Sequence, residues 1–243
     1  MKGLYEKSEI KFAVMWIVIY CAVQSLANGI NEAVGIAYSA SAALCIIQTV
    51  ILLAFIKKNG LSEKYGLCKS PLPARSFLYY LPLAVIPPSC FWNGAVLNFD
   101  PGNICRVLCM LCVGFLEEII FRGFLFKAMA KNNVKSAVIV SSVTFGIGHI
   151  VNLFNGSGME LVSNFCQMIF AVSIGFLFVT IFYRGGSLLP CIITHSLNNA
   201  LNTFANDAGV TVTQQIIHAL VITVVTVGYT LILTKTLPQK AAV

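Results

Sequence analysis

Residues 104–125 read ICRVLCMLCVGFLEEIIFRGFL, and this stretch decides how the whole chain is interpreted. It is long and apolar enough to cross a membrane, for which about 20 mostly apolar residues suffice. It nevertheless contains Glu117, Glu118 and Arg122. Ionised side chains at membrane depth cost from about 2.5 to more than 10 kcal/mol each, so they are expected to serve a function.

The rest of the chain also has the composition of a membrane protein. Of its 243 residues, 58% are hydrophobic and 10% are charged, too few charges to cover a soluble domain of this size. We therefore predict an all-α polytopic membrane protein, with residues 1–243 forming a single transmembrane domain. The predicted spans number about eight: 12–29, 33–56, 76–96, 104–126, 136–154, 161–183, 187–206 and 212–234. Pro87 and Pro88 should kink or break the third span.

Two features of the first half leave alternatives. The first span follows Lys2, Lys7 and Lys11 and ends near Ser25-Leu26-Ala27, which resembles a signal-peptide cleavage site. Because its apolar stretch is long for a signal peptide, we expect a retained helix. The longest connection, residues 57–75, is expected to be a cytoplasmic surface loop.

Basic residues fall on alternate connections of this eight-span arrangement. They are Lys2, Lys7, Lys11, Lys57, Lys58, Lys64, Lys69, Arg75, Lys127, Lys131, Lys135, Arg184, Lys235 and Lys240. The opposite connections carry Glu32, Asp100, Glu160 and Asp207, with Arg106 as the exception. The positive-inside rule then places both termini in the cytoplasm, and the net charge of +7 reflects topology rather than nucleic-acid binding. Short loops and the lack of targeting signals favour the plasma membrane of a bacterium.

The nine cysteines form no CxxC pair and no regular framework. Most of them lie in or beside apolar runs, where cysteine behaves as a small hydrophobic residue. Disulfides and a cysteine metal site are therefore not expected.

Polar residues inside the predicted spans gather at one depth. At 1.5 Å per residue, Glu117, His149 and His195 lie about 15, 20 and 12 Å from the predicted cytoplasmic ends of their spans, and Asn199 lies about 18 Å away. His218 lies near the opposite surface and is not expected to join them. Asn198 and Asn202 accompany Asn199 in the seventh span.

Helical spacing orients these side chains. Glu118 and Arg122 are four residues apart, so they can pair on one face, whereas Glu117 points about 100° away. His195 and Asn199 project together for the same reason. Gly146 and Gly148 should allow another helix to pack closely beside His149.

This set of residues suits the hydrolysis of a carbonyl compound within the membrane. A glutamate beside a histidine can deprotonate water, and a second histidine with an asparagine can stabilise an oxyanion. The chain has no G-x-S-x-G and no H-E-x-x-H motif. A zinc site made by Glu117, His149 and His195 remains chemically possible. The structural alternative is a buried polar cluster that only holds the helices together.

Three ordered motifs resemble those of the CAAX protease and bacteriocin-processing family, also called the Abi or CPBP family. They are EEIIFR (117–122), FGIGH (145–149) and HSLNN (195–199), within a family core at about 104–206. The resemblance implies an intramembrane endopeptidase related to the type II prenyl-protein protease. Its substrate would be a membrane-associated or lipidated peptide or protein.

The resemblance also implies roles for the motif residues. Glu117 and His149 would activate water, while His195 and Asn199 would form the oxyanion hole. The supporting residues would be Glu118, Arg122 and Phe145, the last by packing the second motif. We expect a glutamate mechanism without a metal cofactor, with zinc as the alternative.

Two other functions are weighed against proteolysis. Some members of the family are thought to act as bacteriocin-immunity proteins or membrane scaffolds, without proteolysis. A small transporter would also explain buried Glu and His, but no inverted repeat is visible. In a bacterium, peptide pheromones, leader peptides or small membrane proteins would be the expected substrates. The sequence does not indicate the oligomeric state.

Overall fold

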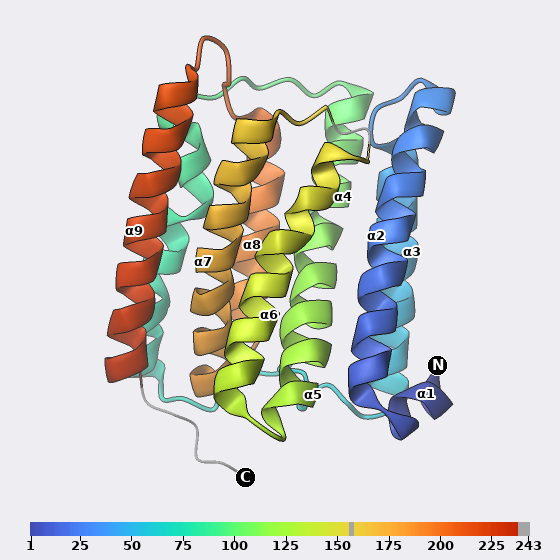
Figure 1. Ribbon diagram of the computed structural model, residues 1–243, viewed down its shortest axis with the longest axis vertical. Helices are drawn as coiled ribbons and strands as arrows, with labels where there is room; N and C mark the ends of the chain where they lie inside the picture. Colours follow the sequence, from blue (N-terminus) through green and yellow to red (C-terminus); the bar gives the residue numbers. More distant parts are fainter. Residues whose placement is uncertain (156–157, 238–243) are drawn as a thin grey trace.

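The computed structural model describes residues 1–155 and 158–237 of the chain (Figure 1). Over these residues it contains helices and no β-strand, which confirms the all-α prediction. Lys240, one of the basic residues used for the topology, lies outside the described residues.

The α-helices follow one another up and down the bundle. They are α1 (Lys2–Lys7), α2 (Glu9–Val34), α3 (Ser39–Lys58), α4 (Pro101–Glu117), α5 (Lys127–Ala130), α6 (Val134–Gly148), α7 (Leu161–Gly185), α8 (Leu189–Leu201) and α9 (Val212–Thr236). Tighter 3-10 helices are η1 (Ala74–Val85), η2 (Pro87–Asn93), η4 (His149–Leu153) and η5 (Asn202–Phe204). One wider π-helix, η3 (Glu118–Phe126), joins α4 to α5.

Several helices begin where a polar side chain caps the free backbone N–H groups. Ser8, Asp100 and Asn133 accept from the backbone N–H three residues on, at the starts of α2, α4 and α6. Thr211 and Gln214 form a reciprocal capping box at the start of α9. These short local signals fix where the long apolar segments begin.

Five helical segments are long and apolar enough to cross a membrane: α2, α3, Val134–Leu153, α7 and α9. The three other predicted spans are helical but interrupted or short. The third consists of η1 and η2, which are separated before Pro87. The fourth changes from α to π geometry after Glu117, and α8 has only 13 residues. The multi-pass character is thus confirmed, while the count of eight spans and the membrane orientation remain predictions. The short helix α1 was not predicted.

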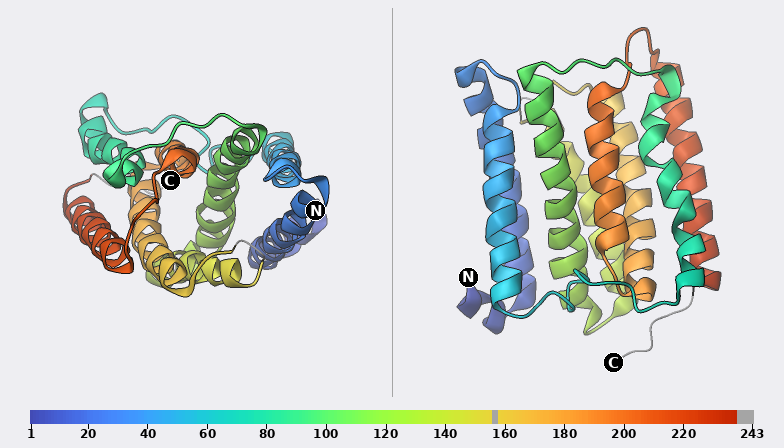
Figure 2. Two further views of the ribbon diagram at one scale, coloured as in Figure 1. Left: turned by 90° about the horizontal axis from the view of Figure 1, so that it is seen from above. Right: turned by 180° about the vertical axis from the view of Figure 1, so that it is seen from behind.

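The helices form one flattened bundle (Figure 2). Helices α2 and α3 lie at one side, α9 with η1 and η2 at the other, and α4, α7 and α8 lie between them. Close pairs are α3 with α4, α4 with α8, α6 with α7, and α7 with α9. This order brings the first, second and third sequence motifs, carried by α4–η3, α6 and α8, to the middle of the bundle.

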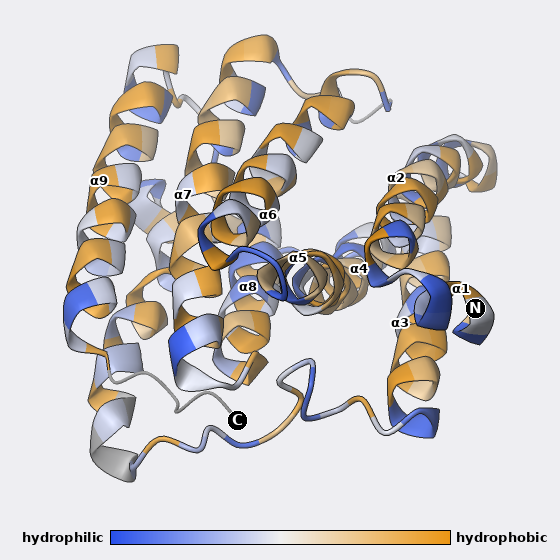
Figure 3. Cartoon of the chain, turned by 60° about the horizontal axis from the view of Figure 1, so that its bottom comes forward, coloured by the Kyte–Doolittle hydropathy of each residue, from blue (hydrophilic) through white to orange (hydrophobic). Residues whose placement is uncertain are grey.

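Hydrophilic residues lie at the end of the bundle that carries α1 (Figure 3), where α1 ends in Lys7 and α3 ends in Lys57 and Lys58. Glu9 binds Lys64 at 2.6 Å and Lys131 at 2.8 Å, and these ion pairs connect α2 to the connection after α3 and to the turn after α5. The predicted surface loop 57–75 is not simply a surface loop. Tyr65 is buried, and Leu188 donates its backbone N–H to the Gly66 carbonyl at 2.8 Å. The connection therefore closes the bundle beneath α7 and α8.

Candidate active site

The paired carboxylates lie where the backbone changes its winding. Glu117 is the last residue of α4 and Glu118 is the first of the π-helix η3, and their exposed fractions are 9% and 0%. All nine residues of η3 are buried. A π-helical stretch is rare and is often found at functional sites, because it re-aims side chains within an otherwise regular helix.

Glu118 pairs with Arg122 as predicted. Oε1 of Glu118 lies 3.1 Å from Nη1 of Arg122, and both side chains are fully buried. The angle does not suit a hydrogen bond, and within the described residues no Arg122 nitrogen has a hydrogen-bond partner. The guanidinium instead lies over the ring of Phe145, 4.0 Å from its centroid, with Phe178 at 5.9 Å. Charge attraction and the two aromatic faces hold the cation in place.

A glycine brings the helix of the third motif against that of the first. A Cβ at Gly114 in α4 would lie 2.5 Å from the backbone nitrogen of Ser196 in α8, so only glycine permits this approach. Ser196 also donates its hydroxyl to the Leu111 carbonyl at 2.9 Å. Since Ser196 follows His195, the close approach places the imidazole beside the two carboxylates.

Gly146 makes a similar approach between α6 and α7. A Cβ there would lie 2.7 Å from the backbone nitrogen of Val172. The same expectation for Gly148 was wrong, because a Cβ at that position would meet nothing within 4 Å. Close packing of α6 thus begins one turn before His149 rather than directly beside it.

His195 lies between both glutamates. Its Nδ1 lies 2.8 Å from Oε1 of Glu118, and its Nε2 lies 3.4 Å from Oε2 of Glu117. An ionised carboxylate only accepts hydrogen bonds, so Nδ1 must donate to Glu118 if that group is ionised. Phe145 packs edge-on against the imidazole at 5.8 Å. The second motif therefore supports the ring of the third.

Glu117 has a partner that sequence reasoning missed. The hydroxyl of Tyr20, in α2, donates to Oε1 of Glu117 at 2.8 Å, and Tyr20 is 8% exposed. With Tyr20 on one oxygen and His195 facing the other, the carboxylate is held from two sides. The two residues are 97 positions apart, so no sequence signal could have joined them.

His149 lies at the end of α6, at the start of η4. Its Nδ1 lies 3.0 Å from the carbonyl oxygen of Phe145, which can only accept, so this nitrogen carries a proton. In the neutral ring Nε2 is then a lone-pair acceptor. Asn164 in α7 donates to the His149 carbonyl at 2.8 Å and fixes the backbone there.

Two cavities meet at these residues. The larger has a volume of about 360 Å³ and is lined by Tyr20, Glu117, His149 and Asn199, among others. A smaller cavity of about 120 Å³ is lined by His149, His195 and Asn199. No direct contact joins Glu117 and His149, but both face the larger cavity. His218 lies apart, stacked on Trp92, in agreement with its predicted exclusion.

Asn199 reaches both cavities from α8. Its amide oxygen accepts a long 3.4 Å contact from the neighbouring Asn198, which leaves its NH₂ group directed to other partners. His195 and Asn199 are one helical turn apart, as predicted, and both line the smaller cavity. A carbonyl group in that cavity would meet hydrogen-bond donors from a single helix.

The alternative zinc site is not assembled by this arrangement. Within residues 1–155 and 158–237, no three His, Cys, Asp or Glu side chains form a group that could hold a metal ion. Both ring nitrogens of His195 already face carboxylates. All nine cysteines are free. The donor set therefore does not fit a metal as placed.

The part of the chain that carries the motifs matches a known protein family. Residues 103–201 match the family described as type II CAAX prenyl endopeptidase Rce1-like. The matched segment contains every residue of the three motifs and excludes α2, and therefore Tyr20. No curated protein and no solved structure matches the chain significantly.

Proposed function

We propose that the chain, whose residues 103–201 match the type II CAAX prenyl endopeptidase Rce1-like family, is an intramembrane endopeptidase. Its substrate would be a membrane-associated or lipidated peptide or protein. The observation that carries the proposal is the convergence of Glu117, His149 and Asn199 on one internal cavity, with His195 beside them.

In the proposed reaction, Glu117 accepts a proton from a water molecule as the oxygen attacks the carbonyl carbon of the scissile peptide bond. A new C–O bond forms and the carbonyl becomes an oxyanion. When the C–N bond breaks, Glu117 returns the proton to the leaving amine, and the two products are a carboxylic acid and an amine. The nearby Nε2 of His149 accepts the second hydrogen bond of the water.

The oxyanion would be stabilised from α8. Asn199 donates through its NH₂ group, and His195 donates through Nε2 when its ring carries both protons. In the substrate-free protein that nitrogen faces Glu117. Glu118 and Arg122 hold the ring from the opposite side, so their role is to position it rather than to touch the substrate.

The test compares two matched variants of the full-length protein in membranes. Glu117→Gln keeps the size of the side chain but removes the base, so it should abolish cleavage while leaving folding nearly intact. Glu32→Gln makes the same chemical change on an exposed surface and should have no effect. Mass spectrometry of membrane-peptide termini would read the outcome. Termini that persist in Glu117→Gln would contradict the proposal and favour a non-proteolytic immunity or scaffold role.

A second measurement addresses the metal. In the glutamate mechanism, the purified protein keeps its activity in a strong chelator and contains no stoichiometric metal. Loss of activity in chelator, restored by zinc, would instead make Glu117, His149 and His195 ligands of a zinc-activated water.

A further inference from the structure

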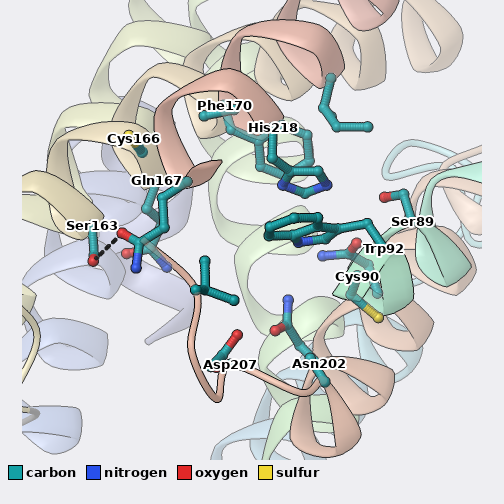
Figure 4. Close-up of a pocket in the computed structure, with 16 residues that line it drawn as sticks. Ser89, Cys90, Trp92, Ser163, Cys166, Gln167, Phe170, Asn202, Asp207 and His218 are labelled. Carbon is teal, nitrogen blue, oxygen red and sulfur yellow. Dashed lines mark hydrogen bonds between the residues drawn. The ribbon is translucent and has the colours of Figure 1, made fainter. Parts of the chain in front are cut away.

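A third cavity adjoins the candidate active site. It has a volume of about 310 Å³ and lies between η2, α7, α8 and α9 (Figure 4). The stacked rings of Trp92 and His218, 5.0 Å apart and nearly parallel, form one wall. The residues that line only this cavity, and neither of the other two, take no part in the proposed chemistry.

This cavity shares lining residues with the reaction centre. Gln167, Phe170, Asn198 and Asn202 line both it and the smaller cavity, which is also lined by His195 and Asn199. Gln167 and Asn202 also line the larger cavity, which is also lined by Glu117. The third cavity therefore lies directly beside the proposed site of water attack.

Primary amide side chains dominate the polar part of its lining. Gln167, Asn198, Asn202 and Gln215 all face it, and we call it the amide-lined cavity. The side-chain oxygen of Gln215 accepts from Ser163 at 2.9 Å and that of Gln167 accepts from Asn152 at 3.1 Å, so their NH₂ groups remain available. Within the described part of the chain Asn202 makes no side-chain hydrogen bond.

Such a lining matches the needs of an extended peptide. Each residue of an unwound backbone presents one N–H donor and one C=O acceptor, and leaving them unsatisfied at membrane depth costs several kcal/mol each, roughly. Primary amides offer both a donor and an acceptor. The Trp92–His218 wall adds an apolar surface for a side chain of the same peptide.

The charges of the lining residues further restrict the class of ligand that the cavity can bind. Asp207 lines the amide-lined cavity, and no Lys or Arg is among the described residues that line it. A phosphate headgroup would meet a carboxylate without a compensating cation. A neutral or basic peptide segment is therefore favoured over an anionic lipid headgroup.

Part of the lining of the amide-lined cavity comes from the end of the bundle opposite the lysines. Trp92 is in the last turn of η2, while Asp207 and Val210 belong to the connection before α9, which lies at the far end of the bundle from α1 (Figure 1). The amide-lined cavity therefore lies toward the end of the bundle with the acidic connections.

We propose that the amide-lined cavity is the subsite for the peptide segment beside the scissile bond. The segment it takes is extended and neutral or basic. This inference rests on the proposed protease function and adds the substrate class.

The test places a larger side chain inside the cavity and makes a similar substitution at a neighbouring position outside it as the control. Ala219 lines the cavity, whereas Leu220 is 53% exposed on the outside of the same helix. The probes are two sets of fluorogenic ten-residue peptides, rich in Lys or rich in Glu, added to the full-length protein in detergent. Ala219→Phe should raise KM at least tenfold, and Leu220→Phe should leave it unchanged. Lys-rich probes should be preferred, and Asp207→Asn should reduce that preference.

Binding of the probe is also measured without cleavage, so that a failure of the subsite proposal can be distinguished from a failure of the protease proposal. A photo-crosslinking residue is placed at position 219 or 220 of the Glu117→Gln protein. Crosslinking of a Lys-rich probe at 219 but not at 220 supports the subsite even if the wild type cleaves nothing, and that result would count against the protease. Cleavage that is unaffected by Ala219→Phe, with no crosslink at 219, would overturn the subsite and keep the protease. A preference for Glu-rich probes would also overturn it.

Discussion

Within the described residues, the hydroxyl of Tyr20 makes the one hydrogen bond to Glu117 that comes from outside the family-matched segment. We predict that Tyr20→Phe lowers kcat about tenfold with KM unchanged, because a hydrogen bond to a charged group contributes about 1.5–3 kcal/mol and here it orients the base. Tyr38→Phe is the matched control, since Tyr38 lines the same cavity without touching Glu117. Steady-state kinetics of both variants, with circular dichroism as a folding check, would decide. Equal rates for both would show that Tyr20 has no positioning role.

Arg122 is the residue of the site whose loss should destabilise the folded protein most. Removing its charge leaves Glu118 buried without its cation, which should destabilise the folded protein by about 3–5 kcal/mol. Arg122→Met should therefore lower both the yield and the thermal midpoint in detergent, and activity should fall with them. Lys2→Met, at an exposed surface ion pair, should change neither. A stable but inactive Arg122→Met protein would instead assign the guanidinium a direct chemical role.

At the scale of the element, the first motif depends on the change from α to π geometry after Glu117. The wider turn leaves the Phe121 carbonyl to accept the Ser141 hydroxyl of α6 at 2.8 Å, which links the first motif to the helix of the second. Nothing in residues 104–125 distinguishes this winding from a continuous α-helix. The sequence predicted which residues pair within the segment, but not how the backbone carries them.

The close approach of α4 and α8 gives a prediction for one glycine. Gly114→Ala should force α8 away from α4, because the new methyl group would overlap the backbone of Ser196. Activity should fall at least tenfold as His195 leaves the carboxylates, together with a lower thermal midpoint. The control is Gly29→Ala in α2, where a Cβ meets nothing within 4 Å, so stability should be unchanged or slightly higher. Full activity in Gly114→Ala would mean that the approach does not position the site.

For the whole molecule, the segregation of charge predicts a topology. Basic residues gather at the end that carries α1, and Glu32, Asp100, Glu160 and Asp207 lie in or beside the opposite connections. Reporter tags at both termini should therefore be cytoplasmic. Single cysteines introduced at Glu63 and Asp207, in a cysteine-free background, should react with a membrane-impermeant reagent only from the inside and the outside, respectively. Labelling of position 63 from outside would reverse the orientation.

The sequence by itself determined the class of the protein, the positions of its long apolar segments and the motif residues of the candidate site. It could do so because membrane burial leaves a continuous apolar pattern, against which each buried charge stands out. The ion pair of Glu118 with Arg122 was predictable for the same reason, since it lies within a single turn.

Only the tertiary structure decided how those residues meet. It placed His195 between Glu117 and Glu118, put the hydroxyl of Tyr20 against Glu117, and brought Glu117 and His149 to one cavity without a hydrogen bond between them. It also showed that residues 57–75, which were predicted to be a surface loop, pack against the bundle through the buried Tyr65. These features depend on how closely helices far apart in sequence approach, which Gly114 and Gly146 permit but which hydropathy does not encode.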